Sequence, residues 1–219
     1  MDLWQSIDQY CERTDASLLS EPLNLFSNTG FILAGLAIIK SLKSSPAKPL
    51  PPGAWFLTSM ILIIGFGSGL FHSFANTWSM WADVLPIAIF VFAYLWLFLR
   101  HRAHQSRAVA LVTLTGFLVL SFFVAKLADH HTSNGSESYF GTWIALFGIS
   151  CFYAGRGEPI NQRRMLLGTL LFSLSILFRT MDEAFCYRWP LGTHVFWHLL
   201  NSLVLFLVTK AYISTRGRS

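Results

Sequence analysis

Two histidines stand four residues apart near the end of the chain, in the stretch GTHVFWHLLNS at positions 192–202. Residues four apart share one face of a helix, so His194 and His198 could ligate one metal ion. A zinc ion with three protein ligands keeps an open position, where it binds water and lowers the water's pKa to about 7. An HxxxH pair alone is equally typical of histidines at the lipid headgroup level, so the hypothesis needs a third ligand nearby.

The composition indicates that membrane helices position these histidines. The chain has 219 residues, of which 53% are hydrophobic and 12% charged, whereas soluble domains carry about 25% charged residues. A spanning helix needs about 20 mostly apolar residues. The sequence therefore predicts an all-α membrane protein, a seven-transmembrane helix bundle at residues 24–213, with an N-terminal hook at 1–23 and a tail at 214–219. The predicted spans are 24–42, 55–74, 83–100, 108–126, 139–155, 165–181 and 194–213.

The sixteen Lys and Arg residues predict the orientation of this bundle. Because cytoplasmic loops carry the excess of positive charge, the side with most of these residues is assigned to the cytoplasm. This places the N-terminus outside and the C-terminus in the cytoplasm. The net charge of +5 is interpreted in the same way, since no RNA- or DNA-binding motif is present and no nucleic-acid partner is expected. The cytoplasmic set is Lys40, Lys43, Lys48, Arg100, Arg102, Arg107, Arg156, Arg163, Arg164, Lys210, Arg216 and Arg218, against Arg13, Lys126, Arg179 and Arg188 outside.

This orientation brings five polar residues from three spans to one depth in the outer leaflet. Ser68 and His72 lie at the outer end of the second span, Asp83 in the first turn of the third, and His194 and His198 at the start of the seventh. His72 would then complete a three-histidine zinc site. Asp83 could orient or deprotonate the water, and Ser68 could hydrogen-bond to a developing oxyanion. Intramembrane ionisable residues are functional candidates by default.

The N-terminal hook gathers carboxylates just before the first span. Glu12, Asp15 and Glu21 occur in the stretch YCERTDASLLSEPLNLFSN. Carboxylate and amide oxygens at such short spacing suit a hard cation such as Ca²⁺. The alternative is a solvated acidic hook without a bound ion, and composition alone favours that alternative.

With these motifs in place, the chain resembles the alkaline ceramidase family of seven-span amidases, which belongs to a superfamily with the adiponectin-receptor-like proteins. Four stretches carry the resemblance: YCERTD with EPLNLFSN, then SGLFHSFANTWSMWAD, then RTMDEAFC, then GTHVFWHLLNS. The resemblance implies a zinc bound by His72, His194 and His198, with Ser68 and Asp83 completing the active site. It implies a zinc-dependent amidohydrolase that cleaves the amide bond of ceramide or a related N-acyl membrane lipid, releasing a sphingoid base or amine and a fatty acid.

The resemblance also implies a calcium site on the hook. Glu12 and Glu21 match the family's positions directly, whereas Gln9 and Thr14 stand where the family has Asp and Asn. An acidic residue is adjacent to each departure. The predicted calcium ligands are therefore Glu12, Glu21, Asp8, Tyr10, Thr14 and Asp15.

The three cysteines lead to separate predictions. Cys11 lies in the hook and Cys186 just before the seventh span. The charge-derived orientation places both outside the cytoplasm, where disulfides persist, and the resemblance points to the same pair, so a Cys11–Cys186 disulfide is expected. Cys151 falls inside the fifth span and is expected to be a small buried hydrophobe.

The compact length and tight loops are similar to bacterial members of the family. We therefore expect a multi-pass protein of a bacterial inner membrane with the active site toward the periplasmic side. Two alternatives stay open: a receptor-like seven-span protein with a structural zinc, and a proton-coupled transporter that uses the same histidines and Asp83 as a relay. The transporter requires polar residues through the whole depth of the bundle, whereas the inner halves of the spans are nearly pure Leu, Ile, Val and Phe.

Overall fold

The computed structural model describes residues 2–46, 49–127 and 134–214, so the predicted tail lies outside the described residues except for Ser214. Every regular element within these ranges is a helix, and a single β-bridge joins Ser6 to Asn76. The helices are α1 (Pro22–Ser27), α2 (Thr29–Lys43), α3 (Ala54–Phe74), α4 (Thr77–Leu97), the π-helix η1 (Phe98–Arg102), α5 (Arg107–Leu127), the 3₁₀-helix η2 (Ser136–Tyr139), α7 (Phe140–Gly155), α8 (Pro159–Phe185) and α9 (His194–Ile213).

Six segments in the described part of the chain are long and apolar enough to cross a membrane, and they coincide with six of the seven predicted spans. The predicted fifth span corresponds to α7, which has 16 residues. At 1.5 Å per residue that length is about 24 Å, short of a hydrocarbon core of about 30 Å. The spanning segments are Pro22–Lys43, Ala54–Phe74, Thr77–Arg102, Arg107–Leu127, Pro159–Phe185 and His194–Ile213.

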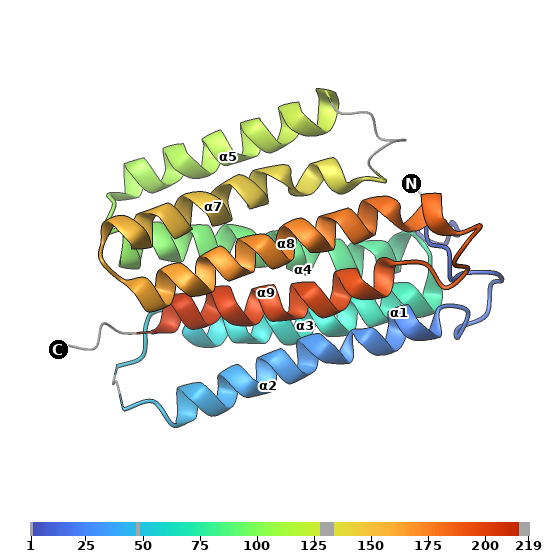
Figure 1. Ribbon diagram of the computed structural model, residues 1–219, viewed down its shortest axis with the longest axis horizontal. Helices are drawn as coiled ribbons and strands as arrows, with labels where there is room; N and C mark the ends of the chain where they lie inside the picture. The colour runs from blue at the N-terminus through green and yellow to red at the C-terminus, as the bar shows by residue number, and fades with distance from the viewer. Residues whose placement is uncertain (1, 47–48, 128–133, 215–219) are drawn as a thin grey trace.

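The helices run roughly parallel or antiparallel along the long axis of the molecule (Figure 1). α9 packs against α8 and α2, α3 packs against α4 and α2, and α7 lies beside α8. α5 is the outermost helix in this view, and Ala110 is its single buried residue. α5 contacts α7, η2 and α4 along one side, and its other sides are apolar and exposed, as a lipid-facing span requires.

Two spans begin or end differently from the sequence prediction. α4 begins at Thr77 rather than near residue 83, because Asn76 and Ser79 form a capping box in which the Ser79 N–H donates to Asn76 Oδ1 at 3.2 Å. Asp83 consequently lies in the second turn of this helix and not in the first. α8 is longer than the predicted span 165–181 at both ends, since the helix begins at Pro159 and ends at Phe185.

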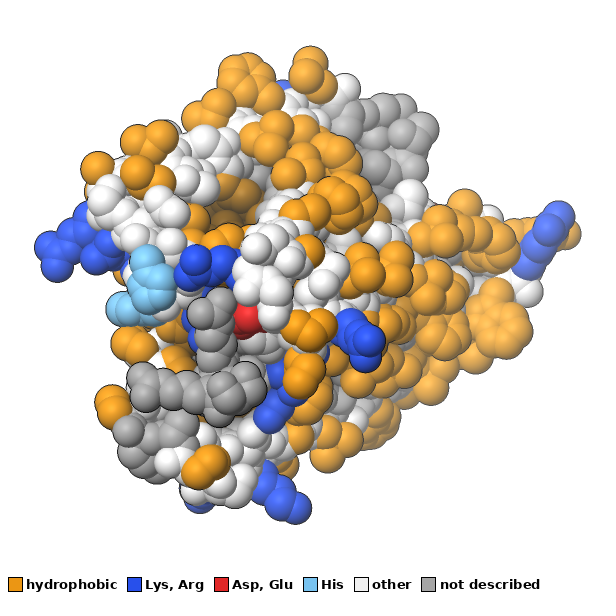
Figure 2. Space-filling view, turned by 60° about the vertical axis from the view of Figure 1, so that its left-hand side comes forward, with side chains coloured by type: hydrophobic (Ala, Val, Ile, Leu, Met, Phe, Trp, Pro, Cys, Tyr) orange, Lys and Arg blue, Asp and Glu red, His pale blue; other side chains and the backbone are white. Residues whose placement is uncertain are grey.

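The loops between α2 and α3, between α4 and α5, and between α7 and α8 lie at the same end of the bundle (Figure 1). Figure 2 brings this end forward and shows that Lys and Arg side chains gather around it, whereas hydrophobic side chains cover much of the flank. The opposite end holds the N-terminal hook, the turn between α3 and α4, and the start of α9 (Figure 1). Of the twelve basic residues assigned to one side by sequence, the nine that the structure describes therefore do share one end, whereas Lys48, Arg216 and Arg218 lie outside the described residues.

The half of the bundle nearest the basic end is less uniformly apolar than expected. Tyr94, Tyr153 and Tyr212 are buried there, and each hydroxyl donates to a backbone carbonyl: that of Val208 at 3.1 Å, of Ala211 at 3.3 Å and of Pro52 at 2.7 Å, respectively. These bonds link neighbouring segments to one another. They do not form a chain of titratable groups across the bundle.

The prediction for Cys151 is wrong. Its side chain is exposed on α7, because the buried face of that helix carries Leu146, Ile149 and Tyr153 instead. In a membrane-spanning bundle such an exposed position faces lipid.

Candidate metal centre

Three histidines from two helices converge at the end of the bundle opposite the basic loops. His72 comes from the last turns of α3, and His194 and His198 come from the first turns of α9. All three side chains are buried, and one ring nitrogen of each lies within 4.8 Å of the others. The Nε2 atoms of His72 and His198 are 3.1 Å apart, close to the roughly 3.3 Å between two nitrogens bound tetrahedrally to zinc at 2.0–2.1 Å. Three clustered imidazoles therefore fit a metal of this kind.

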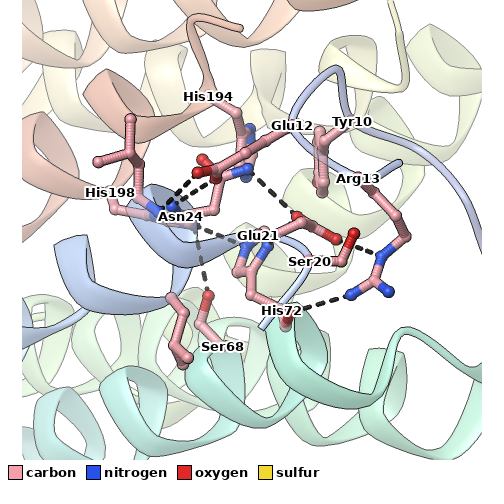
Figure 3. Close-up of polar contacts among 12 residues, drawn as sticks. Tyr10, Glu12, Arg13, Ser20, Glu21, Asn24, Ser68, His72, His194 and His198 are labelled. Atoms are coloured by element: carbon pink, nitrogen blue, oxygen red, sulfur yellow. Dashed lines mark hydrogen bonds and ion pairs between the residues drawn. The ribbon is translucent and has the colours of Figure 1, made fainter. Parts of the chain in front are cut away.

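Hydrogen bonds to the other ring nitrogens hold two of these imidazoles in orientation. Glu21 Oε2 lies 2.6 Å from His72 Nδ1 (Figure 3), and Ser27 Oγ lies 2.8 Å from His198 Nδ1. A partner on one ring nitrogen fixes the tautomer and leaves the other nitrogen free to bind a metal. Carboxylate–histidine pairs of this type are usual around protein-bound zinc.

Arg13 connects the hook to this centre through Glu21. Its Nε donates to Glu21 Oε1 at 2.6 Å, and its Nη2 donates to the backbone carbonyl of His72 at 3.0 Å (Figure 3). Asn24 Nδ2 donates to the second Glu21 oxygen at 3.2 Å. Burial alone would raise the pKa of Glu21, but the bonds from His72, Arg13 and Asn24 outweigh burial and bring that pKa below its ordinary value.

Ser68 and Asp83 lie beside the histidines, as the sequence predicted. Ser68 is one turn before His72, and its Oγ is 3.4 Å from His198 Nε2 (Figure 3). The Ser68 hydroxyl also lies within hydrogen-bonding reach of the Asp83 carboxylate. Gly67 makes this approach of α4 to α3 possible, because a Cβ there would collide with the backbone carbonyl of Ala82. The Oδ1 atom of Asp83 is buried, and no described residue forms a hydrogen bond with it.

Asp182 organises the start of α9 from a neighbouring helix. Its Oδ1 accepts from the backbone N–H of Thr193 at 2.5 Å and of His194 at 2.8 Å, and its Oδ2 accepts from that of Cys11 at 3.0 Å. An anion at a helix N-terminus satisfies unpaired N–H groups and complements the helix dipole. The carboxylate thus sets the direction in which α9 leaves the loop, and with it the position of the two histidines.

The disulfide that the orientation and the resemblance implied is present. It joins Cys11 to Cys186, with the two Cα atoms 5.1 Å apart and a sequence separation of 175. It ties the hook to the loop that leads into α9. Gly192 packs against this junction with a φ of +67°, and a Cβ there would meet both Asp182 and Cys11.

The predicted calcium ligands do not converge on one point among the described residues. Glu12 accepts the backbone N–H groups of Leu23 at 2.6 Å and Asn24 at 2.8 Å, and burial raises its pKa. Glu21 belongs to the histidine centre. Tyr10 is stacked on His194 with ring centroids 3.7 Å apart. Asp8, Thr14 and Asp15 are exposed. This arrangement does not support a calcium site.

Two cavities that share lining residues lie close to His194, which lines the outer one. The outer cavity has a volume of about 530 Å³ and is lined by Asp83, His194 and Arg179 among others. The inner cavity, of about 80 Å³, is almost entirely apolar and extends between α4, α7 and α9 to Tyr94 and Val208. Both cavities share Ile87, Tyr139 and Trp197 as lining residues. A molecule with one polar and one aliphatic part could place its junction at the histidines.

Several residues of the site were not assigned a role from sequence: Arg13, Ser27, Arg179 and Asp182. Arg13, Arg179 and Asp182 do lie in the stretches YCERTD and RTMDEAFC that carry the family resemblance. Their position in these stretches could have identified them as candidate site residues. Ser27 offered none, because a serine in a membrane helix is more often bonded to its own backbone.

Taken together, the fold and the centre define an all-helical, multi-pass membrane protein with a buried three-histidine site open to a cavity. A family model described as Ceramidase matches residues 5–217, and the chain belongs to the ceramidase family. No curated protein matches the chain.

Proposed function

We propose that the protein is a zinc-dependent amidase that cleaves ceramide or a related N-acyl lipid within the membrane. The observation that carries this proposal is the group of three oriented, buried imidazoles beside Ser68 and Asp83, where a polar cavity meets an apolar one. Membership of the ceramidase family supports the same substrate class.

His72, His194 and His198 would hold the metal, which when bound supplies a Lewis acid and lowers the pKa of water. Asp83 accepts the proton of the attacking water, a role suited to a carboxylate oxygen that lacks another partner. The Ser68 hydroxyl donates to the oxygen of the amide carbonyl as negative charge develops on it. The acyl chain lies in the inner cavity among Phe90, Leu146 and their neighbours, which exclude water from it.

We further propose that α7 completes a seven-span bundle, with the N-terminus outside and the C-terminus in the cytoplasm. The gathering of Lys and Arg at one end of the bundle supports this orientation (Figure 2). The histidines then lie in the outer leaflet. The protein would be in a bacterial inner membrane with its active site toward the periplasmic side, and the disulfide on that side agrees with an oxidising compartment.

The two alternative functions are less consistent with the geometry. A structural zinc usually has four protein ligands and no open position, whereas this centre has three histidines and adjoins a cavity. A proton relay needs titratable groups through the bundle, whereas the buried tyrosine hydroxyls of the inner half are bonded to backbone carbonyls.

The deciding experiment combines metal analysis with lipid analysis on the wild-type protein. Purified protein is assayed for bound metals by mass spectrometry, then incubated with a mixture of ceramides of different acyl lengths. We expect about one zinc per chain and the release of sphingoid base and fatty acid in equal amounts. Full zinc content without either product would contradict the amidase and favour a receptor-like protein.

A further inference from the structure

Arg179 is a buried cation that the proposed reaction does not use. It lies on α8 with 7% of its surface exposed. Its guanidinium carbon is 5.7 Å from the ring centroids of Tyr10 and Tyr139 and 5.5 Å from that of Trp197. Its Nη1 donates to the Tyr10 hydroxyl at 2.7 Å. Three aromatic rings therefore enclose it, and they hold the guanidinium in one position.

None of the ion pairs found among the described residues includes Arg179. Its Nε is buried and has no hydrogen-bond partner in the described part of the chain. An unpaired charge within a membrane span is costly, and such residues usually face a partner or a ligand. Aromatic rings attract a guanidinium but do not accept its hydrogen bonds in the plane of the group. An acceptor for Nε is therefore missing among residues 2–46, 49–127 and 134–214, which are the residues that the structure describes.

The outer cavity is the place where a ligand could supply the acceptor that Arg179 Nε lacks. Three of the buried polar atoms without partners, Asp83 Oδ1, His194 Nδ1 and Arg179 Nε, come from residues that line this one cavity. The proposed reaction gives roles to Asp83 and His194. It leaves Arg179 facing the space that the polar part of the lipid would occupy.

We propose that Arg179 binds an anionic oxygen of the lipid, a carboxylate, phosphate or sulfonate, in the outer cavity. The planar guanidinium matches these groups, and hydrogen bonds between charged partners are the strong ones. Tyr10 contacts both Arg179 and His194, so the Tyr10 side chain separates the bound anion from the metal centre. Only its assignment to a lipid rests on the proposed amidase function.

The carboxylates that line the outer cavity do not supply the acceptor for Arg179. Asp8 and Glu183 line it but are exposed, so water screens them. Glu137 also lines the cavity, but the ion pairs found among the described residues do not join it to Arg179. Asp83 attracts Arg179 electrostatically but forms no ion pair with it. The anion can come from two sources: a charged head group on the amine side of the substrate, or the fatty acid that hydrolysis releases.

Binding without hydrolysis tests the site directly. Wild-type protein, Arg179→Gln and Arg179→Lys are placed in phosphatidylcholine nanodiscs and titrated with dodecyl phosphate and with dodecanol. Arg188→Gln is the matched control, because Arg188 is an exposed arginine of the loop after α8. We expect the wild type and the control to prefer dodecyl phosphate at least tenfold, the Gln variant to lose this preference, and the Lys variant to retain part of it.

A second arm distinguishes the two sources of the anion. The KM and kcat for ceramide and ceramide 1-phosphate are compared, together with inhibition by laurate. A rise in KM for the phosphate alone in Arg179→Gln, with kcat unchanged, assigns the head group, whereas weaker inhibition by laurate alone assigns the released fatty acid.

Equal dodecyl phosphate binding by Arg179→Gln and Arg188→Gln would overturn the anion site. If Arg179→Gln does not yield disulfide-bonded protein, Arg179→Lys decides, and unchanged dodecyl phosphate binding in that variant counts against the proposal. Dodecyl phosphate binding without amide hydrolysis would instead contradict the amidase and leave the anion site standing.

Discussion

The two ends of the bundle both contain buried polar groups, but these groups are bonded in different ways. At the basic end, Tyr94, Tyr153 and Tyr212 each donate to a backbone carbonyl of the protein. At the histidine end, buried atoms of Asp83 and Arg179 have no partner among the residues that the structure describes, and both residues line a large cavity. Buried polar groups in proteins are nearly always hydrogen-bonded, so the exceptions need a reason.

Thr209 Oγ1, near the basic end, is also buried without a partner among the described residues, but Thr209 lines neither cavity. The difference therefore separates polar groups that stabilise the fold from unpaired polar groups that line a cavity and could bind a ligand. Substitutions at the histidine end should remove metal or activity and leave the fold intact. Substitutions at the basic end should lower stability and leave the chemistry intact. Each prediction below tests one side of this division.

The largest effect is expected for His198→Ala. This variant removes one of three metal ligands. Ser27 contacts Nδ1 of His198, on the side of the ring opposite to the metal-facing Nε2, so the Ser27 hydroxyl cannot take the place of the lost ligand. Bound zinc should fall well below one per chain and amide hydrolysis should be lost. His101→Ala is the control, because His101 is exposed at the basic end. Near-stoichiometric zinc in His198→Ala would exclude the three-histidine centre.

Asp83→Asn separates metal binding from proton transfer. The amide keeps the shape of the carboxylate but is a far weaker proton acceptor. Zinc content should therefore be unchanged, whereas kcat should fall by roughly two to four orders of magnitude, the usual contribution of a general base. Metal analysis and turnover of the same preparation check both parts. Wild-type turnover in this variant would remove Asp83 from the mechanism.

Glu21→Gln tests whether the hook carboxylate serves the metal centre. Loss of the charged partner of His72 Nδ1 should weaken zinc affinity by about 10- to 100-fold, the range found for such outer partners. Competition with a chelator measures this change. Asp15→Asn is the matched control, since Asp15 is an exposed carboxylate of the same hook and should leave zinc affinity unchanged. A comparable loss in both variants would mean that the hook acts only through its overall charge.

Much of the fold and of the site could be predicted from the sequence. Apolar length alone located the helices, and the positions of Lys and Arg brought His72, His194 and His198 to one depth. The predicted start of α4 was wrong, because a search for apolar length does not detect a helix start that is set by polar capping residues such as Asn76 and Ser79. The role of Glu21 was assigned to calcium, because sequence spacing cannot show that Arg13 and His72 occupy its oxygens. Contacts between segments far apart in the chain have no local signal.

The smallest effect is expected at the basic end. Tyr212 is fully buried, and its hydroxyl donates to the Pro52 carbonyl at 2.7 Å, so Tyr212→Phe leaves a partly buried carbonyl without its partner. The expected loss is about 1 kcal/mol, which corresponds to a fall of roughly 2–4 °C in the melting temperature of a chain of this size. Zinc content and kcat should be unchanged, because the inner cavity and the histidines keep their lining. Tyr187→Phe is the control, since Tyr187 is 96% exposed and its hydroxyl stabilises nothing in the fold. A loss of turnover in Tyr212→Phe at full zinc content would show that the two ends of the bundle are coupled, and the division between fold-holding and ligand-binding polar groups would then fail.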